Sequence, residues 1–149
     1  MTKVKVLVLS SLAAMTFVAA PQALKAADAP CPQQNETLRG TYISLHPTGL
    51  YVGTGPGTGP ATANGTITFD GRGNSSNTFS ASINGAIQQG VTVVGPYVVN
   101  PDCTGTLSQS DGSHYDFVVM PDGSRFSWIE TDTGSVFSGE AARFTNQNQ

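Results

Sequence analysis

Two tight turns separate three alternating runs in residues 114–144, HYDFVVMPDGSRFSWIETDTGSVFSGEAARF. In each run, aromatic and aliphatic side chains recur at every second position, a period that is typical of a half-buried β-strand. The turns PDGS (121–124) and TDTG (131–134) contain glycine, which supplies the positive φ that a tight hairpin requires. The stretch therefore predicts three consecutive antiparallel strands.

The same pattern continues toward the N-terminus, and turn residues recur at the spacing of roughly 8 to 12 positions that is typical of all-β sandwiches and barrels. The predicted strands are 37–46, 61–70, 77–84, 90–100, 104–110, 114–120, 124–131 and 135–144. Short connections make consecutive strands neighbours, and closure removes exposed edges. We therefore predict an all-β domain over residues 37–146, an eight-stranded antiparallel meander that closes into a small barrel.

Alternation also predicts which side chains face the interior of this barrel. The expected core residues are Ile67, Phe69, Phe79, Ala81, Ile83, Tyr115, Phe117, Val119, Phe126, Trp128 and Phe137. One segment, HPTGLYVGTGPGTGPATANG (46–65), breaks the pattern because its Gly-Thr-Gly-Pro repeats are poor strand formers. We expect a mobile loop over one end of the barrel, either a lid or a plain crossover.

The pattern of the first 26 residues indicates a targeting signal. Lys3 and Lys5 precede an apolar run over 6–20 and then small residues, the order found in a cleaved signal peptide. The run is shorter than the roughly 20 residues of a membrane span, and no second apolar run follows it. We therefore predict a signal peptide (1–26), a leader (27–36) and an exported protein, periplasmic or extracellular, without a membrane span.

Charge limits the partners of the predicted mature protein. Removal of residues 1–26 removes every lysine and leaves four arginines against ten carboxylates, a formal net charge of −6. Such a surface repels phosphate backbones and anionic lipid heads, so we expect neither nucleic acid nor membrane surfaces as partners.

The chain has only two cysteines, Cys31 and Cys103. In an oxidising compartment, two cysteines most simply form a disulfide, which here would tie the leader to the start of the fifth strand. A nucleophilic cysteine would need a nearby base, and a zinc site would need more ligands than one cysteine and two widely spaced histidines. We predict the disulfide.

No constellation with a specific catalytic or metal-binding pattern emerges. His114 and Asp116 share a face of one strand, but polar residues beside a turn are also ordinary hairpin flanks. Asp70 and Asn74 in DGRGN offer oxygen ligands for calcium, but the segment has fewer acidic residues than a calcium-binding loop. We therefore assign no catalytic residue, no metal and no cofactor.

The interior of the barrel is the remaining candidate site. The candidate ligand-binding residues are Tyr97, Tyr115, Trp128, Arg125 and Glu130. Aromatic bodies with polar tips suit a small-molecule cavity, but the same aromatics could fill the core of a small barrel.

Three motifs, FDGRGN (69–74), GPYVVNPDCTGTL (95–107) and DGSRFSWIETDTGSVFSGEAAR (122–143), resemble a group of small exported bacterial proteins that are mostly uncharacterised. The resemblance implies a barrel similar to the calycin and allene oxide cyclase-like folds, whose members include ligand carriers and cyclases. No catalytic residue transfers by position. We expect a non-enzymatic barrel that binds a small apolar ligand or serves as a structural module; the alternative is a cyclase or isomerase acting on an apolar substrate inside the barrel.

Overall fold

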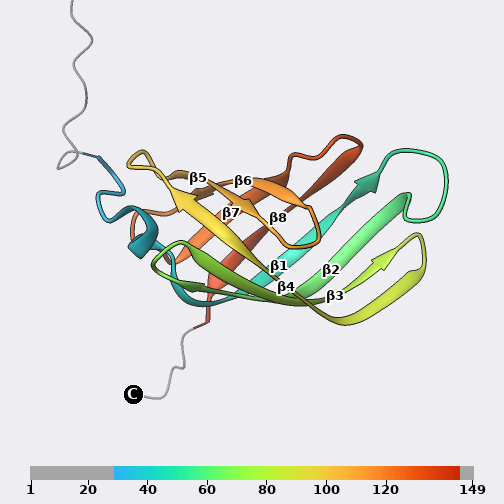
Figure 1. The fold of residues 1–149 in the computed structure, drawn as a ribbon, viewed down its shortest axis with the longest axis horizontal. Helices are drawn as coiled ribbons and strands as arrows, with labels where there is room; N and C mark the ends of the chain where they lie inside the picture. Colours follow the sequence, from blue (N-terminus) through green and yellow to red (C-terminus); the bar gives the residue numbers. More distant parts are fainter. Residues whose placement is uncertain (1–28, 145–149) are drawn as a thin grey trace, which may run out of the picture.

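A computed structural model of the chain describes residues 29–144 and shows a closed barrel of eight antiparallel strands in a meander (Figure 1). The predicted fold class is confirmed. The strands are β1 (Arg39–Tyr51), β2 (Gly59–Asp70), β3 (Asn74–Ile83), β4 (Ala86–Val99), β5 (Thr104–Ser108), β6 (His114–Val119), β7 (Arg125–Glu130) and β8 (Ser135–Arg143), preceded by a 3-10 turn, η2 (Gln34–Thr37). Strand β8 pairs with β1 and closes the barrel.

Turn chemistry fixes the order of the strands. Asn84 and Gly85 join β3 to β4 with φ values of 49° and 85°, as expected for a two-residue hairpin with positive φ at both positions. In other turns an aspartate accepts a hydrogen bond from the backbone N–H two residues later, as Asp122 does from Ser124 at 2.9 Å. The same pairing occurs at Asp70 and Arg72, Asp102 and Thr104, and Asp111 and Ser113.

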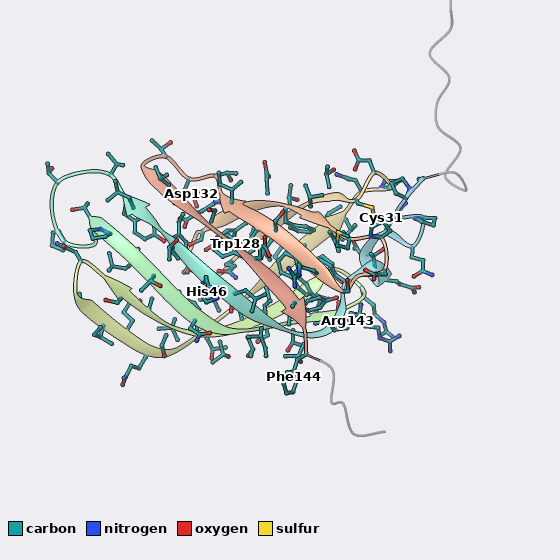
Figure 2. All side chains as sticks on the ribbon, turned by 180° about the vertical axis from the view of Figure 1, so that it is seen from behind. Cys31, His46, Trp128, Asp132, Arg143 and Phe144 are labelled. Carbon is teal, nitrogen blue, oxygen red and sulfur yellow. A yellow bond between two sulfur atoms is a disulfide. The ribbon has the colours of Figure 1, made fainter. Side chains whose placement is uncertain are left out.

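The predicted long loop over 46–65 is wrong, because most of this segment is strand. Residues Thr48 to Tyr51 of β1 pair with residues Gly59 to Thr62 of β2, so only residues 52–58 form a loop. A bulge at His46 and Pro47 shifts the register of β1. His46 has a φ of 50° there and is exposed, within the strand rather than at its end (Figure 2).

The alternation predicted from the sequence is confirmed on both faces. Every expected core residue is buried or half-buried. Most positions between them, including Thr66, Thr68 and Ser127, are exposed, and Ser82 is half-buried.

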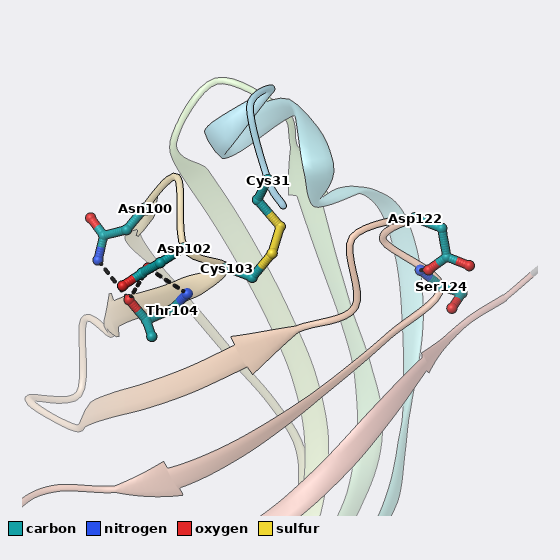
Figure 3. The surroundings of a disulfide bond; sticks show 7 residues. All are labelled: Cys31, Asn100, Asp102, Cys103, Thr104, Asp122 and Ser124. Carbon is teal, nitrogen blue, oxygen red and sulfur yellow. Dashed lines mark hydrogen bonds between the residues drawn. A yellow bond between two sulfur atoms is a disulfide. The ribbon is translucent and has the colours of Figure 1, made fainter. Parts of the chain in front are cut away.

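The predicted disulfide is present (Figure 3). The Cα atoms of Cys31 and Cys103 lie 5.1 Å apart. The backbone N–H of Cys31 donates to the carbonyl of Pro101 at 2.9 Å, and the N–H of Val99 donates to the side-chain oxygen of Asn35 at 2.7 Å. The leader is therefore fixed against the connection between β4 and β5.

The two ends of the barrel differ. The end that carries the disulfide, here called the closed end, is covered by residues 29–33 of the leader and by η2, and it holds the turns 71–73, 100–103 and 120–124 (Figure 1). The opposite end, here called the open end, holds the loop 52–58 and the turns 84–85, 109–113 and 131–134. Strand β5 pairs with β4 only over Tyr97 to Val99, so the first half of β4 projects beyond the shorter strands with β3.

Candidate functional site: a cavity at the open end

The open half of the barrel contains a cavity of about 170 Å³. Its wall is formed by inward-facing side chains from every strand. The main apolar members are Ala61, Ile67, Phe79, Ala81, Ile83, Leu107, Phe117, Phe126 and Phe137. A volume close to 150 Å³ is enough to hold a benzene molecule, so the cavity accommodates a ring with a short substituent.

A chain of four aromatic rings forms one side of the cavity. Tyr115 packs edge-on against Trp128, with ring centroids 5.4 Å apart, and Trp128 lies 5.5 Å from Phe137. Phe137 in turn stacks with Tyr51 at 5.8 Å. Two of the predicted ligand-binding residues, Tyr115 and Trp128, therefore line this cavity side by side.

A third predicted residue, Glu130, is not among the cavity-lining residues but is buried beside Tyr51, with 7% of its surface exposed. The Tyr51 hydroxyl donates to its Oε2 atom at 3.0 Å. Burial raises the pKa of Glu130 above its ordinary value, and the hydrogen bond from Tyr51 offsets part of that rise. Burial, followed by the Glu130 carboxylate, raises the pKa of the Tyr51 phenol.

Sequence reasoning missed Tyr51, because it assigned residues 46–65 to a loop. The signal was nonetheless available: Gly49 and Tyr51 alternate with Leu50 and Val52, and the structure turns the first pair inward and the second pair outward. Gly49 leaves room for the Phe137 ring, since a Cβ atom at that position would lie 2.7 Å from a ring carbon.

Asn77 is a second residue that sequence reasoning did not single out. It lines the cavity from β3, and its Oδ1 atom is buried with no hydrogen-bond partner among the described residues. An unpaired buried acceptor is costly, so this atom is a natural partner for a donor on a bound molecule or a water.

The other two predicted ligand residues lie away from the cavity. Tyr97 is buried in the closed half, where its hydroxyl is 2.9 Å from the carbonyl oxygens of Asn35 and Leu38. Burial raises the pKa of Tyr97 to about 12. Arg125 is exposed on the outer face and forms an ion pair with Glu140 at 3.3 Å. Arg125 and Glu130 are five positions apart on one strand, so they point to opposite faces.

His114 does not reach the cavity either. It is exposed on the outer face, and its Nδ1 atom lies 2.8 Å from Oδ1 of Asp132, while its backbone N–H donates to the other oxygen of Asp132. This partner comes from the turn between β7 and β8, whereas the sequence had suggested Asp116. The backbone hydrogen bond from His114 is the main cause of the lowered pKa of Asp132. The contact between His114 and Asp132 therefore stabilises the turn between β7 and β8.

The DGRGN segment is a hairpin. The carboxylate of Asp70 accepts hydrogen bonds from the N–H of Arg72, the N–H of Asn74 and the Asn74 side-chain amide, at 2.7, 2.9 and 2.7 Å. These donors, led by the Asn74 amide, lower the pKa of Asp70 to about 2. Within residues 29–144, no three His, Cys, Asp or Glu side chains gather as a metal site would require.

Comparison with protein-family models, with curated proteins and with solved structures gives no match for this chain. No helix among the described residues has the length and apolar character needed to cross a membrane.

Proposed function

We propose that the protein binds a small, mostly apolar molecule in the open half of its barrel and does not transform it. The observation that carries the proposal is the cavity of about 170 Å³, which combines aromatic walls with a few polar atoms. Ligand sites in proteins are concave and mostly apolar, with a small number of polar groups that orient the ligand. The closed half, in contrast, is filled by side chains.

A thermal-shift panel tests this proposal directly. Monocyclic terpenoids, substituted benzenes and short-chain alcohols are added to the purified protein, and a ligand that binds only the folded state raises the melting temperature by mass action. At a ligand concentration of 100 times Kd the stabilisation is about 2.7 kcal/mol. Absence of any shift across the panel would contradict ligand binding and leave a structural role.

A matched pair of variants on β3 shows where a ligand binds. Ala81→Phe places a ring in the cavity wall, whereas Ser76→Phe places the same ring on the exposed outer face of the same strand. We expect Ala81→Phe to abolish the thermal shift and Ser76→Phe to retain it. A shift that survives Ala81→Phe would locate binding elsewhere.

The second candidate function is a cyclase or isomerase, and the hydrogen-bonded pair of Tyr51 and Glu130 favours it. Tyr51 lines the cavity, so the buried Glu130 carboxyl, whose pKa is raised, can exchange a proton with a substrate through the Tyr51 hydroxyl. The two functions differ in what is recovered after incubation. A carrier returns the ligand unchanged by mass spectrometry and NMR, whereas an enzyme returns an isomer.

Export of the protein is part of the proposal. Its support is the signal-like order of residues 1–26, which lie outside the described part, together with the disulfide between Cys31 and Cys103. Membership in the group of small exported bacterial proteins rests on the three motifs quoted above. Protein recovered from the periplasm or medium should have an intact mass that lacks the signal peptide (1–26) and is lighter than the reduced form by two hydrogen atoms.

A further inference from the structure

We propose that the cavity selects a cationic ligand, a small aromatic or cyclic amine, over a neutral or anionic molecule of the same shape. This inference rests on the proposed function, because it concerns the ligand of the same cavity. It depends on three features of the described residues: the distribution of charge between the two ends, the aromatic wall with Glu130 hydrogen-bonded to Tyr51, and the acceptor character of the cavity.

Basic and acidic side chains are distributed unequally between the ends of the barrel. All four arginines belong to the closed end: Arg39 begins β1, Arg72 lies in the turn 71–73, Arg125 begins β7, and Arg143 ends β8. Residues 29–144 contain no lysine. Figure 2 shows Arg143 and Cys31 toward one end of the molecule and Asp132 toward the other.

Both ends carry acidic side chains, among them Asp70, Asp102 and Asp122 at the closed end, but only at the open end are they without an arginine. At the open end Asp111 lines the cavity, Glu130 is buried beside Tyr51, and Asp132 lies in the adjacent turn. His114, a basic residue at this end, lies on the outer face, where its imidazole contacts the Asp132 carboxylate. Within residues 29–144, no arginine, lysine or histidine lines the cavity. The potential at its mouth is therefore negative, which concentrates cations there and opposes the entry of carboxylates.

The aromatic wall strengthens this preference. The faces and edges of Tyr51, Tyr115, Trp128 and Phe137 surround a space that is partly shielded from solvent, and a cation over an aromatic face is attracted by the ring quadrupole. The Glu130 carboxylate accepts a hydrogen bond from the Tyr51 hydroxyl, and Glu130 is the cross-strand neighbour of Tyr115 in the β6–β7 register. A positive charge at this wall would be stabilised by the rings and by the carboxylate together.

The unpaired Oδ1 atom of Asn77 in the cavity also favours a ligand that donates hydrogen bonds. Asn77 Oδ1 can only accept a hydrogen bond, and no described residue donates to it. A ligand that carries N–H groups supplies such a donor, whereas a carboxylate brings further acceptors. Charge, aromatic surface and hydrogen bonding thus favour the same class of ligand.

Three compounds of nearly equal size test the inference: 2-phenylethylamine, 2-phenylethanol and phenylacetate. At pH 7 the first is a cation, the second is neutral and the third is an anion, as expected from the ordinary pKa values of amines and carboxylic acids. Trp128 is the only tryptophan of the chain and lines the cavity, so its fluorescence reports occupancy directly. Dissociation constants are measured by titration of the full protein at low ionic strength.

We expect 2-phenylethylamine to bind about tenfold more tightly than 2-phenylethanol, and phenylacetate to bind weakest. If the alcohol binds as tightly as the amine, or if phenylacetate binds best, the charge preference is overturned while ligand binding stands. If none of the three binds, the amine class is overturned, and the wider thermal-shift panel then decides whether the cavity binds anything.

A pair of charge-neutralising variants identifies the source of the preference. Glu130→Gln removes the buried carboxylate but keeps an acceptor for Tyr51, and Glu140→Gln removes an equal charge from the exposed outer face. We expect Glu130→Gln to reduce the amine-to-alcohol affinity ratio at least threefold and Glu140→Gln to leave it unchanged. An unchanged ratio in Glu130→Gln would overturn the role given to Glu130.

Discussion

The two halves of this barrel are built from the same strands, yet one is packed and the other is hollow. In the closed half, Tyr42, Phe69 and Tyr97 pack edge to face with one another and with Phe126, which also lines the cavity, with ring centroids 4.8 to 5.6 Å apart. In the open half, comparable aromatic residues surround a cavity of about 170 Å³. An aromatic side chain therefore acts as core or as binding wall according to what covers its end of the barrel.

Polar groups follow the same division. In the closed half the Tyr42 hydroxyl donates to the carbonyl of Gly123 at 2.6 Å and accepts from the Arg143 guanidinium at 3.0 Å. The same guanidinium also donates to the Thr37 carbonyl at 3.3 Å. In the open half Asn77 Oδ1 has no partner among the described residues, and Glu130 has a raised pKa. The polar groups of the closed half thus have partners within the protein, whereas the open half keeps an unpaired acceptor that the proposed ligand would meet.

The largest effect on stability is expected from truncation of the packed aromatic cluster. Phe69→Ala should lower the free energy of unfolding by roughly 3 to 5 kcal/mol, because it leaves a cavity among Tyr42, Tyr97 and Phe126. Phe79→Ala, a matched change in the half-buried wall of the open half, should cost only about 1 kcal/mol since less surface is lost. Urea unfolding compares the two, and equal losses would contradict the division into halves.

The next largest effect concerns the disulfide that closes one end. Replacing both cysteines with alanine should lower the stability by about 2 to 4 kcal/mol, since the bridge closes a loop of 72 residues in the unfolded chain. The barrel ladder remains, so far-UV circular dichroism should retain its β character. Ligand affinity at the open end should persist within about twofold of the unmodified protein. A large loss of binding would show that the two halves are coupled.

Glu130→Gln should change stability by less than either of these variants, and in the opposite direction. A raised folded pKa means that the buried carboxyl disfavours the fold when ionised, and that this penalty disappears as pH falls through the folded pKa. We therefore expect Glu130→Gln to raise the melting temperature at pH 7 and to lose that advantage near pH 4. Thermal unfolding at both pH values measures the difference, and a lower melting temperature at pH 7 would contradict the assignment.

The smallest effect is expected in acid and belongs to the turns of the closed end. Hydrogen bonds lower the pKa of Asp70 to about 2, and they also lower the pKa values of Asp102 and Asp122. A depressed pKa contributes stability that is present above the ordinary value near 4 and is lost as pH falls toward 2. Asp70→Asn should therefore flatten the acid side of the stability profile. If the stability of Asp70→Asn depended on pH as that of the unmodified protein does, Asp70 would not contribute to the loss of stability in acid.

Local patterns were sufficient to predict the eight strands, their order and the facing of their side chains, but not the extension of β1 to Tyr51 or the start of β2 at Gly59. Asn84 and Gly85, for example, specify a hairpin whatever surrounds them. The bulge at His46 and Pro47 could not be predicted in this way, because it depends on the register of β1 against both β2 and β8. Tertiary pairing also overrode the weak strand propensity of Thr48 to Tyr51 and so placed Tyr51 in the wall.

The candidate site was predictable only in part. Alternation places Tyr115, Trp128 and Glu130 inside the barrel and Arg125 outside it. Alternation also places Tyr97 inside but gives no position along the barrel axis, and that position decides between packed core and cavity wall. The hollow half arises from unequal strand lengths and from the leader that covers only one end, and neither is a local property of the sequence.

The central claim, that one half is packed and the other is hollow, is tested most directly by methyl NMR under xenon pressure. Xenon enters apolar cavities that exist in the folded protein and shifts the signals of the methyl groups that line them. We predict saturable shifts for Ala81 and Ile83 at the open end and none for Val99 and Val119 in the closed half. Shifts in both halves, or in neither, would contradict the account.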